Sequence, residues 1–421
     1  MTTRKSSALA HRLAGRAFFL LITVTILAGP ALGQWTQWGG PTSDFKVDSK
    51  GIADFWPEEG PPRLWTRELG DGYSAILADA GRLFTLYRKG DHEIVIALEA
   101  ATGKTVWEHP YVEIPDPKHL EQFGRGPRAT PALCGDRLFT IGVAGQMLCL
   151  DRNTGQEIWS HDLWEEFEAT FLGSGYCSSP FVYRDTVIVL TGGKGNSIIA
   201  FDQEDGSVAW KILDLVNSYS TPRLIRVEGD EQLLCFMASE LVAIDPGNGE
   251  LLWSYAIGNQ WGHNISQPIF DDGVLFLSTT YAGARGLALS REGKEWRVED
   301  VWSTPRIQIY HVTAVGLGDH VYASHGNGMG QVSLFTCVNR KTGDVAWRTR
   351  GLGKANTLHA DGKFILLDED GMLALVRATP EKCTILSRVK ICDGVAWAVP
   401  TLVGTTLYVR DTKRLMALDL G

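Results

Sequence analysis

Polar and aromatic residues recur just before a series of short, β-rich segments, and their types could bind a small ligand or a peptide. Arginine, histidine and asparagine can orient a polar ligand, whereas tyrosine and tryptophan can cover its apolar parts. The candidates are Arg128, Tyr176, Tyr219, His263, Asn264, Tyr310, His311, Asn356 and Trp397. They form one pocket only if the fold brings these segments together. The alternative is that they pack and hydrate a loop surface.

A second group of candidates lies in the long insertion 161–173, and consists of Trp164, Glu165, Glu166, Phe167 and Glu168. Long loops on a rigid scaffold often carry binding residues. An acidic loop that contains aromatic residues could contact a protein or a peptide, although a run of charges is also common on a solvated surface. We treat this segment as a hypothetical partner-binding rim.

No local catalytic pattern accompanies these candidates. Thr102-Gly103-Lys104-Thr105 lacks the earlier glycine of a phosphate loop, because Leu98 occupies that position, and no nucleophile elbow occurs. The seven cysteines include no CxxC pair, and His311, His325 and His359 could bind a metal only if the fold gathered them. We expect mostly buried thiols, with a Cys383–Cys392 bridge as an open alternative. The sequence therefore assigns no catalytic residue and no metal ligand.

The elements that position these residues come from a repeated unit, for which Asp151-Arg152-Asn153-Thr154-Gly155-Gln156-Glu157-Ile158-Trp159 is the clearest copy. Asp or Asn can hydrogen-bond the backbone of a turn, and Gly permits a positive φ. The tryptophan of the returning strand is too large to bury within one small unit, so it must pack on the next unit. The turn glycines are 103, 155, 206, 249 and 343, and a degenerate copy of the repeat has Gly293 before Trp296. The structural tryptophans are Trp65, Trp107, Trp159, Trp210, Trp253 and Trp347.

Eight β-rich segments, spaced along residues 65–421, predict an all-β, eight-bladed β-propeller of four-stranded antiparallel blades. The chain ends on a repeat strand that no tryptophan strand follows, so closing the ring needs a strand from the N-terminus. We expect it at Trp65 or at Trp35, within an N-terminal arm of residues 34–64 that lies against the ring. A linear solenoid is the alternative, but it would need polar caps. In a propeller the candidate loops surround one mouth of the central channel.

Residues 1–33 predict a signal peptide, because Arg4 to Arg16 is basic, residues 17–28 are apolar, and small residues precede Gly33. We expect cleavage near Gly33–Gln34 and a periplasmic or extracellular protein, with an uncleaved anchor as the alternative. The later sequence predicts no membrane helix. The net charge is −9 and the leader contains only basic charges, so the remaining chain is more acidic and nucleic acid is not an expected partner. We expect a monomer.

The repeated Ala-Leu-Asp-x-x-Thr-Gly-x-x-x-Trp pattern resembles the tryptophan-docking repeats of the pyrroloquinoline quinone (PQQ)-like propeller superfamily. That superfamily includes quinoprotein alcohol and glucose dehydrogenases and BamB, the propeller subunit of the outer-membrane β-barrel assembly machinery. The resemblance extends over essentially residues 65–421. It implies the fold strongly and the activity much less, because function depends on sites rather than on folds.

Departures from the family favour a binding protein over an enzyme. The dehydrogenase resemblance implies a vicinal Cys-Cys disulfide and an Asp, Glu and Asn set around calcium. No two cysteines are adjacent here, and the calcium set cannot be mapped onto this chain. We therefore expect a non-enzymatic scaffold that binds a protein or peptide in the bacterial cell envelope and needs no cofactor. The alternative is a quinoprotein-like oxidoreductase, with PQQ and calcium, or a binder of a small ligand at the channel mouth.

Overall fold

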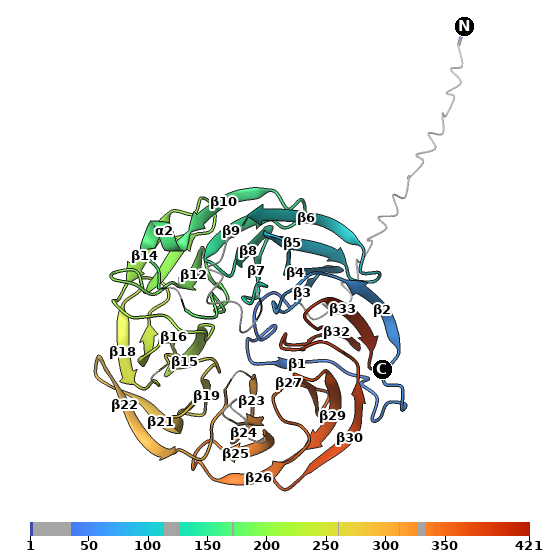
Figure 1. Cartoon of the computed structure of the whole chain (residues 1–421). Coiled ribbons are helices and arrows are strands. Elements are labelled where there is room, and N and C mark those ends of the chain that lie inside the picture. The colour runs from blue at the N-terminus through green and yellow to red at the C-terminus, as the bar shows by residue number, and fades with distance from the viewer. Residues whose placement is uncertain are drawn as a thin grey trace. The chain divides into compact units, whose positions relative to one another are not determined.

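The alternating apolar segments fold into eight antiparallel sheets, which are arranged as the blades of a propeller (Figure 1). The computed structural model describes residues 1–2, 35–112, 124, 126–170, 172–259, 261–310, 312–326 and 333–421. The inner strands of each blade are almost entirely buried, and the outer strands alternate between buried and exposed residues. This burial follows from stacking each sheet between two neighbours. The predicted eight-bladed propeller is confirmed.

The blades follow one another in chain order, each running from the channel outward, and the first four have these bounds. Blade one is β3 (Leu77–Asp79), β4 (Arg82–Lys89), β5 (His92–Glu99) and β6 (Thr105–Val112); blade two is β7 (Ala132–Cys134), β8 (Arg137–Ile141), β9 (Gln146–Asp151) and β10 (Glu157–Asp162); blade three is β11 (Phe181–Tyr183), β12 (Thr186–Leu190), β13 (Ile198–Asp202) and β14 (Val208–Ile212); blade four is β15 (Arg223–Val227), β16 (Asp230–Phe236), β17 (Glu240–Ile244) and β18 (Leu251–Ala256).

The remaining blades complete the ring, and the last one combines the two ends of the chain. Blade five is β19 (Ile269–Asp271), β20 (Val274–Thr279), β21 (Gly283–Glu292) and β22 (Glu295–Thr304); blade six is β23 (Ala314–Leu317), β24 (His320–His325), β25 (Leu334–Asn339) and β26 (Val345–Thr349); blade seven is β27 (Ala355–Ala360), β28 (Lys363–Asp368), β29 (Met372–Ala378) and β30 (Cys383–Lys390); blade eight is β31 (Thr401–Val403), β32 (Thr406–Arg410), β33 (Arg414–Asp419) and β2 (Arg63–Glu68).

Strand β2 closes the ring, because it is the outer strand of blade eight although it precedes blade one in the chain. It pairs antiparallel with β33, and Trp65 lies opposite Ala417. The Trp65 indole donates its Nε1–H to the backbone oxygen of Ala100 in blade one, 3.0 Å away. Of the two strands considered for closure, the Trp65 strand therefore makes it.

The arm before β2 lies along the inner edges of several blades and occupies part of the central channel (Figure 1). Trp35 forms an antiparallel bridge with Ala78 of blade one, and the backbone oxygen of Thr36 accepts a hydrogen bond from Leu133 of blade two. Strand β1 (Lys46–Val47) pairs parallel with β27 of blade seven, at His359. The arm thus makes backbone contacts with the penultimate residue of three inner strands, on the strand edge that faces the channel.

The repeat tryptophans join neighbouring blades. The Trp107 indole lies against Gly155 in the turn of the next blade, and its Nε1–H donates to the backbone oxygen of Arg152 at 3.0 Å. A side chain on Gly155, whose φ is +73°, would collide with the ring, so the turn needs glycine for both conformation and space. The same packing of the ring on the turn glycine recurs where Trp65 meets Gly103, Trp159 meets Gly206, Trp210 meets Gly249 and Trp302 meets Gly343, although the Trp210 Nε1–H has no acceptor among the described residues.

Blade five departs from the predicted repeat. Its outer hairpin has two ten-residue strands, β21 and β22, so Gly293 lies far from the blade interface and has no neighbour within 4 Å. Gly293 and Trp296, noted in the sequence as a degenerate copy of the repeat, do not form the docking unit of this blade, because Trp302 lies at the docking position, opposite Gly286. Trp253, which should dock on the turn of blade five, instead donates to Gln232 of its own blade at 2.7 Å.

Small residues face the docking tryptophans across each outer hairpin, which accounts for two of the cysteines. Cys149 lies opposite Trp159 and Cys337 lies opposite Trp347, at positions that Ala97, Ala200 and Ala243 occupy in other blades. Burial raises the pKa of Cys149 to about 12, so its thiol is neutral. All seven cysteines are free, and the suggested Cys383–Cys392 bridge is not formed.

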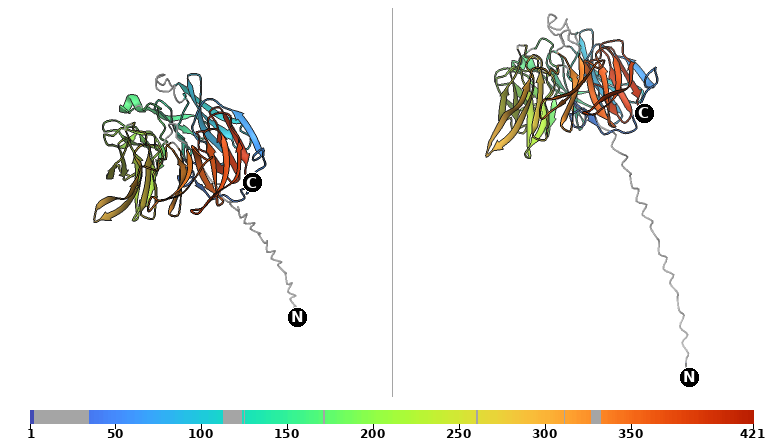
Figure 2. Two further views of the ribbon diagram at one scale, coloured as in Figure 1. Left: turned by 60° about the horizontal axis from the view of Figure 1, so that its bottom comes forward. Right: turned by 90° about the horizontal axis from the view of Figure 1, so that it is seen from below.

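The two ends of the channel differ. Loops that lead from an outer strand to the next inner strand lie at one end, here called the mouth, and the Thr-Gly turns lie at the other, here called the base. In the side views of Figure 2, helix α2 (Leu163–Phe167) projects from the mouth end and the β21–β22 hairpin extends at the base.

Among the described residues, no helix is both long and apolar enough to cross a membrane. The predicted signal peptide and its cleavage point at Gly33–Gln34 lie outside the described residues.

Candidate functional site

The loops at the mouth are tied together by hydroxyl groups that precede the inner strands. Thr130 Oγ1 accepts a hydrogen bond from Ala75 of blade one, Ser179 Oγ accepts from Thr130, and Thr221 Oγ1 accepts from Ser179. Each hydroxyl residue stands before a proline, which has no N–H to leave unpaired at the start of an inner strand. The Ser/Thr-Pro motifs that mark these loops therefore join one blade to the next.

Three of the predicted ligand-binding residues support these loops. Asn264 is fully buried, and its Nδ2 donates to the backbone oxygen of Met237 at 2.7 Å. Asn356 is also buried and its Nδ2 donates to the backbone oxygen of Trp397 at 2.8 Å. Tyr176 is buried with its ring against Gly145. These three side chains hold the mouth in shape, and they contribute little surface to it.

Two other predicted residues form one cluster on the side of blades one, two and eight. The Arg128 guanidinium lies over the Tyr73 ring at 5.2 Å, and the Tyr73 and Trp397 rings are also 5.2 Å apart. The Trp397 Nε1–H donates to Glu369 Oε2 at 3.3 Å, and the other carboxylate oxygen of Glu369 binds Lys354. Sequence reasoning missed Tyr73, Glu369 and Lys354; the position of Tyr73 before the first inner strand was the available signal.

The remaining predicted residues form a second cluster across blades four, five and six. The Tyr219 and His263 rings meet edge to face at 5.3 Å, and Tyr310 Oη lies 3.4 Å from His263 Nδ1. Burial lowers the pKa of His263, so the imidazole is neutral at neutral pH, and burial raises the pKa of Tyr219 to about 12. His311, predicted for the same site, lies outside the described residues.

Exposed apolar side chains continue this second cluster onto the outer surface. Trp261 is 59% exposed and Tyr281 is 46% exposed. Trp261 is two residues before His263, and Tyr281 is close enough to Tyr310 for its charge to influence the pKa of that phenol. We call Tyr219, Trp261, His263, Tyr281 and Tyr310 the mouth surface.

The acidic rim is a short capped helix that is only partly available for binding. Asp162 caps α2 by accepting hydrogen bonds from Trp164 and Glu165, and Glu166 binds His161 at 2.7 Å. Phe167 is buried against Phe201. The solvent-exposed members of the predicted rim are Trp164, Glu165, Glu166 and Glu168.

The PQQ alternative would need a set of metal ligands at the channel mouth. Nowhere within the described residues do three or more His, Cys, Asp or Glu side chains gather in a way that could hold a metal ion. Asn356 and Trp397 at the mouth are engaged with a backbone oxygen, a carboxylate and an aromatic ring.

Comparison with known proteins agrees with the architecture. The family described as outer membrane protein assembly factor BamB matches residues 91–296 and 282–383. Outer membrane protein assembly factor BamB of Shewanella oneidensis is 23% identical over 255 residues, covering 58% of this chain and 62% of that protein. Quinohemoprotein alcohol dehydrogenase ADH IIB of Pseudomonas putida is 25% identical over 203 residues, covering 45% of this chain and 29% of that protein. This chain thus spans less than two thirds of the length of either relative.

The fold also matches a solved structure over nearly its whole length. The crystal structure of BamB from Moraxella catarrhalis superimposes with a TM-score of 0.60 at 16% identity, covering 85% of this chain and 99% of that chain. At this identity the similarity concerns the fold. Because the family match covers more than half of the sequence, we conclude that this chain belongs to the BamB family of PQQ-like β-propellers.

Proposed function

We propose that this protein is a non-enzymatic scaffold that binds a protein or peptide partner in the bacterial cell envelope. The observation that carries this proposal is the mouth surface, where Trp261 and Tyr281 are exposed beside the half-buried His263 and Tyr310. Large aromatic side chains are enriched in protein interfaces, because they cover much apolar area with few rotatable bonds. Family membership supports an envelope partner, and the basic and apolar leader supports export.

The rigid surroundings of the mouth surface suit it for recognition. Asn264, next to His263, is fixed by hydrogen bonds to Met237 and Thr279. The backbone oxygen of Val216 accepts a hydrogen bond from Ala238, against which Gly262 packs. A preorganised surface loses less conformational entropy on binding than a mobile loop does. The exposed acidic residues of α2 extend the same end of the ring and would favour a partner with complementary basic residues.

The test is site-specific photocrosslinking in the native cell envelope. A benzoylphenylalanine in place of Trp261 should crosslink to one defined envelope protein. The same group in place of Ile385, an exposed residue on the outer strand of blade seven, is the matched control and should not. Equal crosslinking at both positions, or at neither, would contradict the proposal.

The oxidoreductase alternative has its own readout. Purified protein is incubated with PQQ and calcium, and quinone absorbance is followed on addition of alcohols and sugars. We expect no retained quinone after gel filtration. A retained quinone whose absorbance bleaches with a substrate would replace the scaffold proposal with an enzymatic one that uses Arg128, Trp397 and their neighbours.

A further inference from the structure

A cavity of about 350 Å³ lies between blades four and five. It is lined by Arg223, Leu224, Ile225, Arg226, Phe270, Asp271 and Asp272, from the inner strands of blades four and five. Its volume is at the lower end of the range for ligand sites. The cavity is distinct from the mouth surface.

The cavity lies at the strand positions that the arm contacts in other blades. The arm hydrogen-bonds the penultimate residue of the inner strand in blades one, two and seven, at Ala78, Leu133 and His359. The penultimate residues in blades four and five are Arg226 and Phe270, and both line the cavity. Among the described residues, the arm makes no backbone hydrogen bond to either. The inner edges of these two strands therefore offer main-chain groups to an added extended segment, as sheet edges do.

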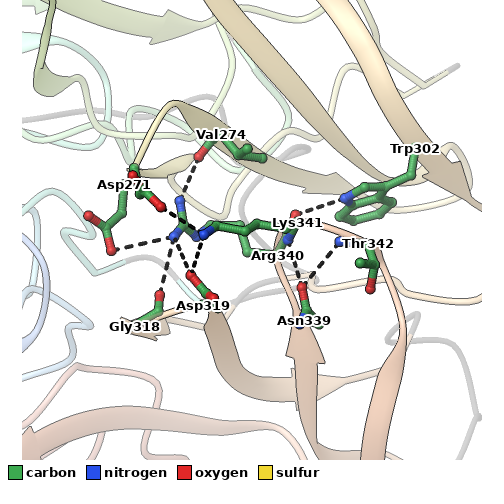
Figure 3. Close-up of polar contacts among 10 residues, drawn as sticks. Asp271, Val274, Trp302, Gly318, Asp319, Asn339, Arg340, Lys341 and Thr342 are labelled. Carbon is green, nitrogen blue, oxygen red and sulfur yellow. Dashed lines mark hydrogen bonds and ion pairs between the residues drawn. The ribbon is translucent and has the colours of Figure 1, made fainter.

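One cation that lines the cavity has no ion-pair partner among the described residues. Arg226 is paired with Glu231 at 2.7 Å, and Asp272 with Lys341 at 2.7 Å. Asp271 lies 3.4 Å from the Arg340 guanidinium (Figure 3). The guanidinium of Arg223, which is half-buried, makes no hydrogen bond or ion pair with any residue of the described part of the chain. One negative charge would compensate it.

The nearest acidic group on the arm does not fill this role. Asp44 is engaged by Lys46 at 2.7 Å and by the Thr42 hydroxyl at 2.6 Å. Burial lowers the pKa of the Arg223 guanidinium, and the negative charge of Asp44 raises it. Asp44 nevertheless makes no hydrogen bond or ion pair with Arg223. A guanidinium forms its strongest contacts with a planar carboxylate, which can accept two parallel hydrogen bonds.

We propose that this cavity binds a short extended peptide segment with one acidic side chain, whose carboxylate pairs with Arg223 while its backbone adds to the inner edges of blades four and five. Leu224, Ile225 and Phe270 also line the cavity, whose accessible surface is mostly polar. A doubly charged phosphate fits less well, because the carboxylates of Asp271 and Asp272 line the same cavity. The inference does not depend on the mouth surface.

The experiment measures binding of Ac-Val-Glu-Val-amide and Ac-Val-Gln-Val-amide to the whole purified protein by titration calorimetry. We expect saturable binding of the glutamate peptide, about tenfold or more tighter than the glutamine peptide, since a hydrogen bond to a charged group contributes that much. Arg223→Met should abolish the preference, and Arg226→Met, in the same cavity, should retain it. Arg223→Met should not lower the melting temperature, because the guanidinium has no partner to lose.

Several results would overturn the proposal. They are no saturable binding, equal binding of the two peptides, or a preference that survives in Arg223→Met. Butyrate that binds as tightly as the glutamate peptide would assign the cavity to a free carboxylate instead, and displacement by millimolar phosphate would assign it to a phosphate. A Trp261→Ala, Tyr281→Ala double variant should leave peptide binding unchanged, which separates this site from the mouth surface.

Discussion

The indole of Trp302 donates its Nε1–H to the backbone oxygen of Arg340, 2.7 Å away, and so joins the outer strand of blade five to the turn of blade six (Figure 3). The Arg340 guanidinium extends back toward blade five, where it donates to the backbone oxygen of Val274 at 2.9 Å and lies 3.4 Å from Asp271. Arg152 and Trp107 repeat this arrangement between blades one and two, with Asp79 in the place of Asp271. Neighbouring blades are thus joined twice, once by the indole of an outer strand and once by a guanidinium that reaches the inner strands.

The docking turn should not tolerate a side chain. Gly343 has a φ of +77°, and an added Cβ would lie 2.6 Å from the Trp302 ring. Gly343→Ala should therefore lower the free energy of unfolding by about 2–4 kcal/mol, from backbone strain and overpacking together. Gly293→Ala is the control, because Gly293 has a φ of +63° and open space around it, so only the strain of about 1 kcal/mol remains. Equal losses in urea denaturation would refute the docking role of the turn.

The buried guanidinium should also matter more than its exposed neighbour. Arg340 is fully buried, and Arg340→Met would leave the backbone oxygens of Val274 and Gly318 without a donor. We expect a loss of about 2 kcal/mol in the free energy of unfolding. Lys341→Met removes only exposed ion pairs with Asp272 and Asp319 and should have no measurable effect. A larger loss in Lys341→Met than in Arg340→Met would count against this assignment.

The arm should contribute directly to the stability of the ring. Trp35 is 2% exposed, and it pairs with Ala78 on the inner strand of blade one. Trp35→Ala should cost about 3–5 kcal/mol, as expected for a buried tryptophan. Trp261→Ala, the same substitution at an exposed position, should leave the melting temperature unchanged. If Trp35→Ala behaves like Trp261→Ala in calorimetry, the arm is not an integral part of the fold.

Stability should fall on mild acidification. Burial lowers the pKa values of His263, His325 and His359, whereas the unfolded chain titrates near 6.5. At a pH between the lowered native pKa values and 6.5, the unfolded state binds more protons than the native state does. The free energy of unfolding is therefore highest above about pH 6.5 and decreases as the pH falls below that value. Urea denaturation at pH 7.5 and 5.5 measures it. His359→Gln should reduce the difference; equal or greater stability at pH 5.5 would contradict the prediction.

The repeats could be predicted because each blade depends on a local pattern, a turn glycine followed by a tryptophan. The pattern failed in blade five, where long strands moved the turn away from the blade interface and Trp302 docked instead of Trp296. Closure by an N-terminal strand followed from the missing last strand, but the choice of Trp65 over Trp35 did not. The path of Trp35 to Val47 along the channel could not be predicted either, because it depends on unpaired strand edges that only the assembled ring creates.

The candidate site was predictable by location and not by role. The position of a loop before an inner strand placed Tyr219, His263 and Tyr310 together. The same position also selected Asn264 and Asn356, which support backbone oxygens, because loop conformation decides whether a polar side chain faces the channel or the next blade. Trp261 and Tyr281 carry no pattern at all, since exposure is a property of the folded surface.

The central claim is that the mouth surface binds a partner protein, and the most direct test is an affinity measurement. The envelope protein captured at Trp261 is purified and titrated against wild-type protein, a Trp261→Ala, Tyr281→Ala double variant, and Ile385→Ala, which changes an exposed residue on the outer strand of blade seven. We predict a dissociation constant at least about tenfold weaker for the double variant, as for interface anchors, and an unchanged value for Ile385→Ala. Equal affinities for all three proteins would contradict the account.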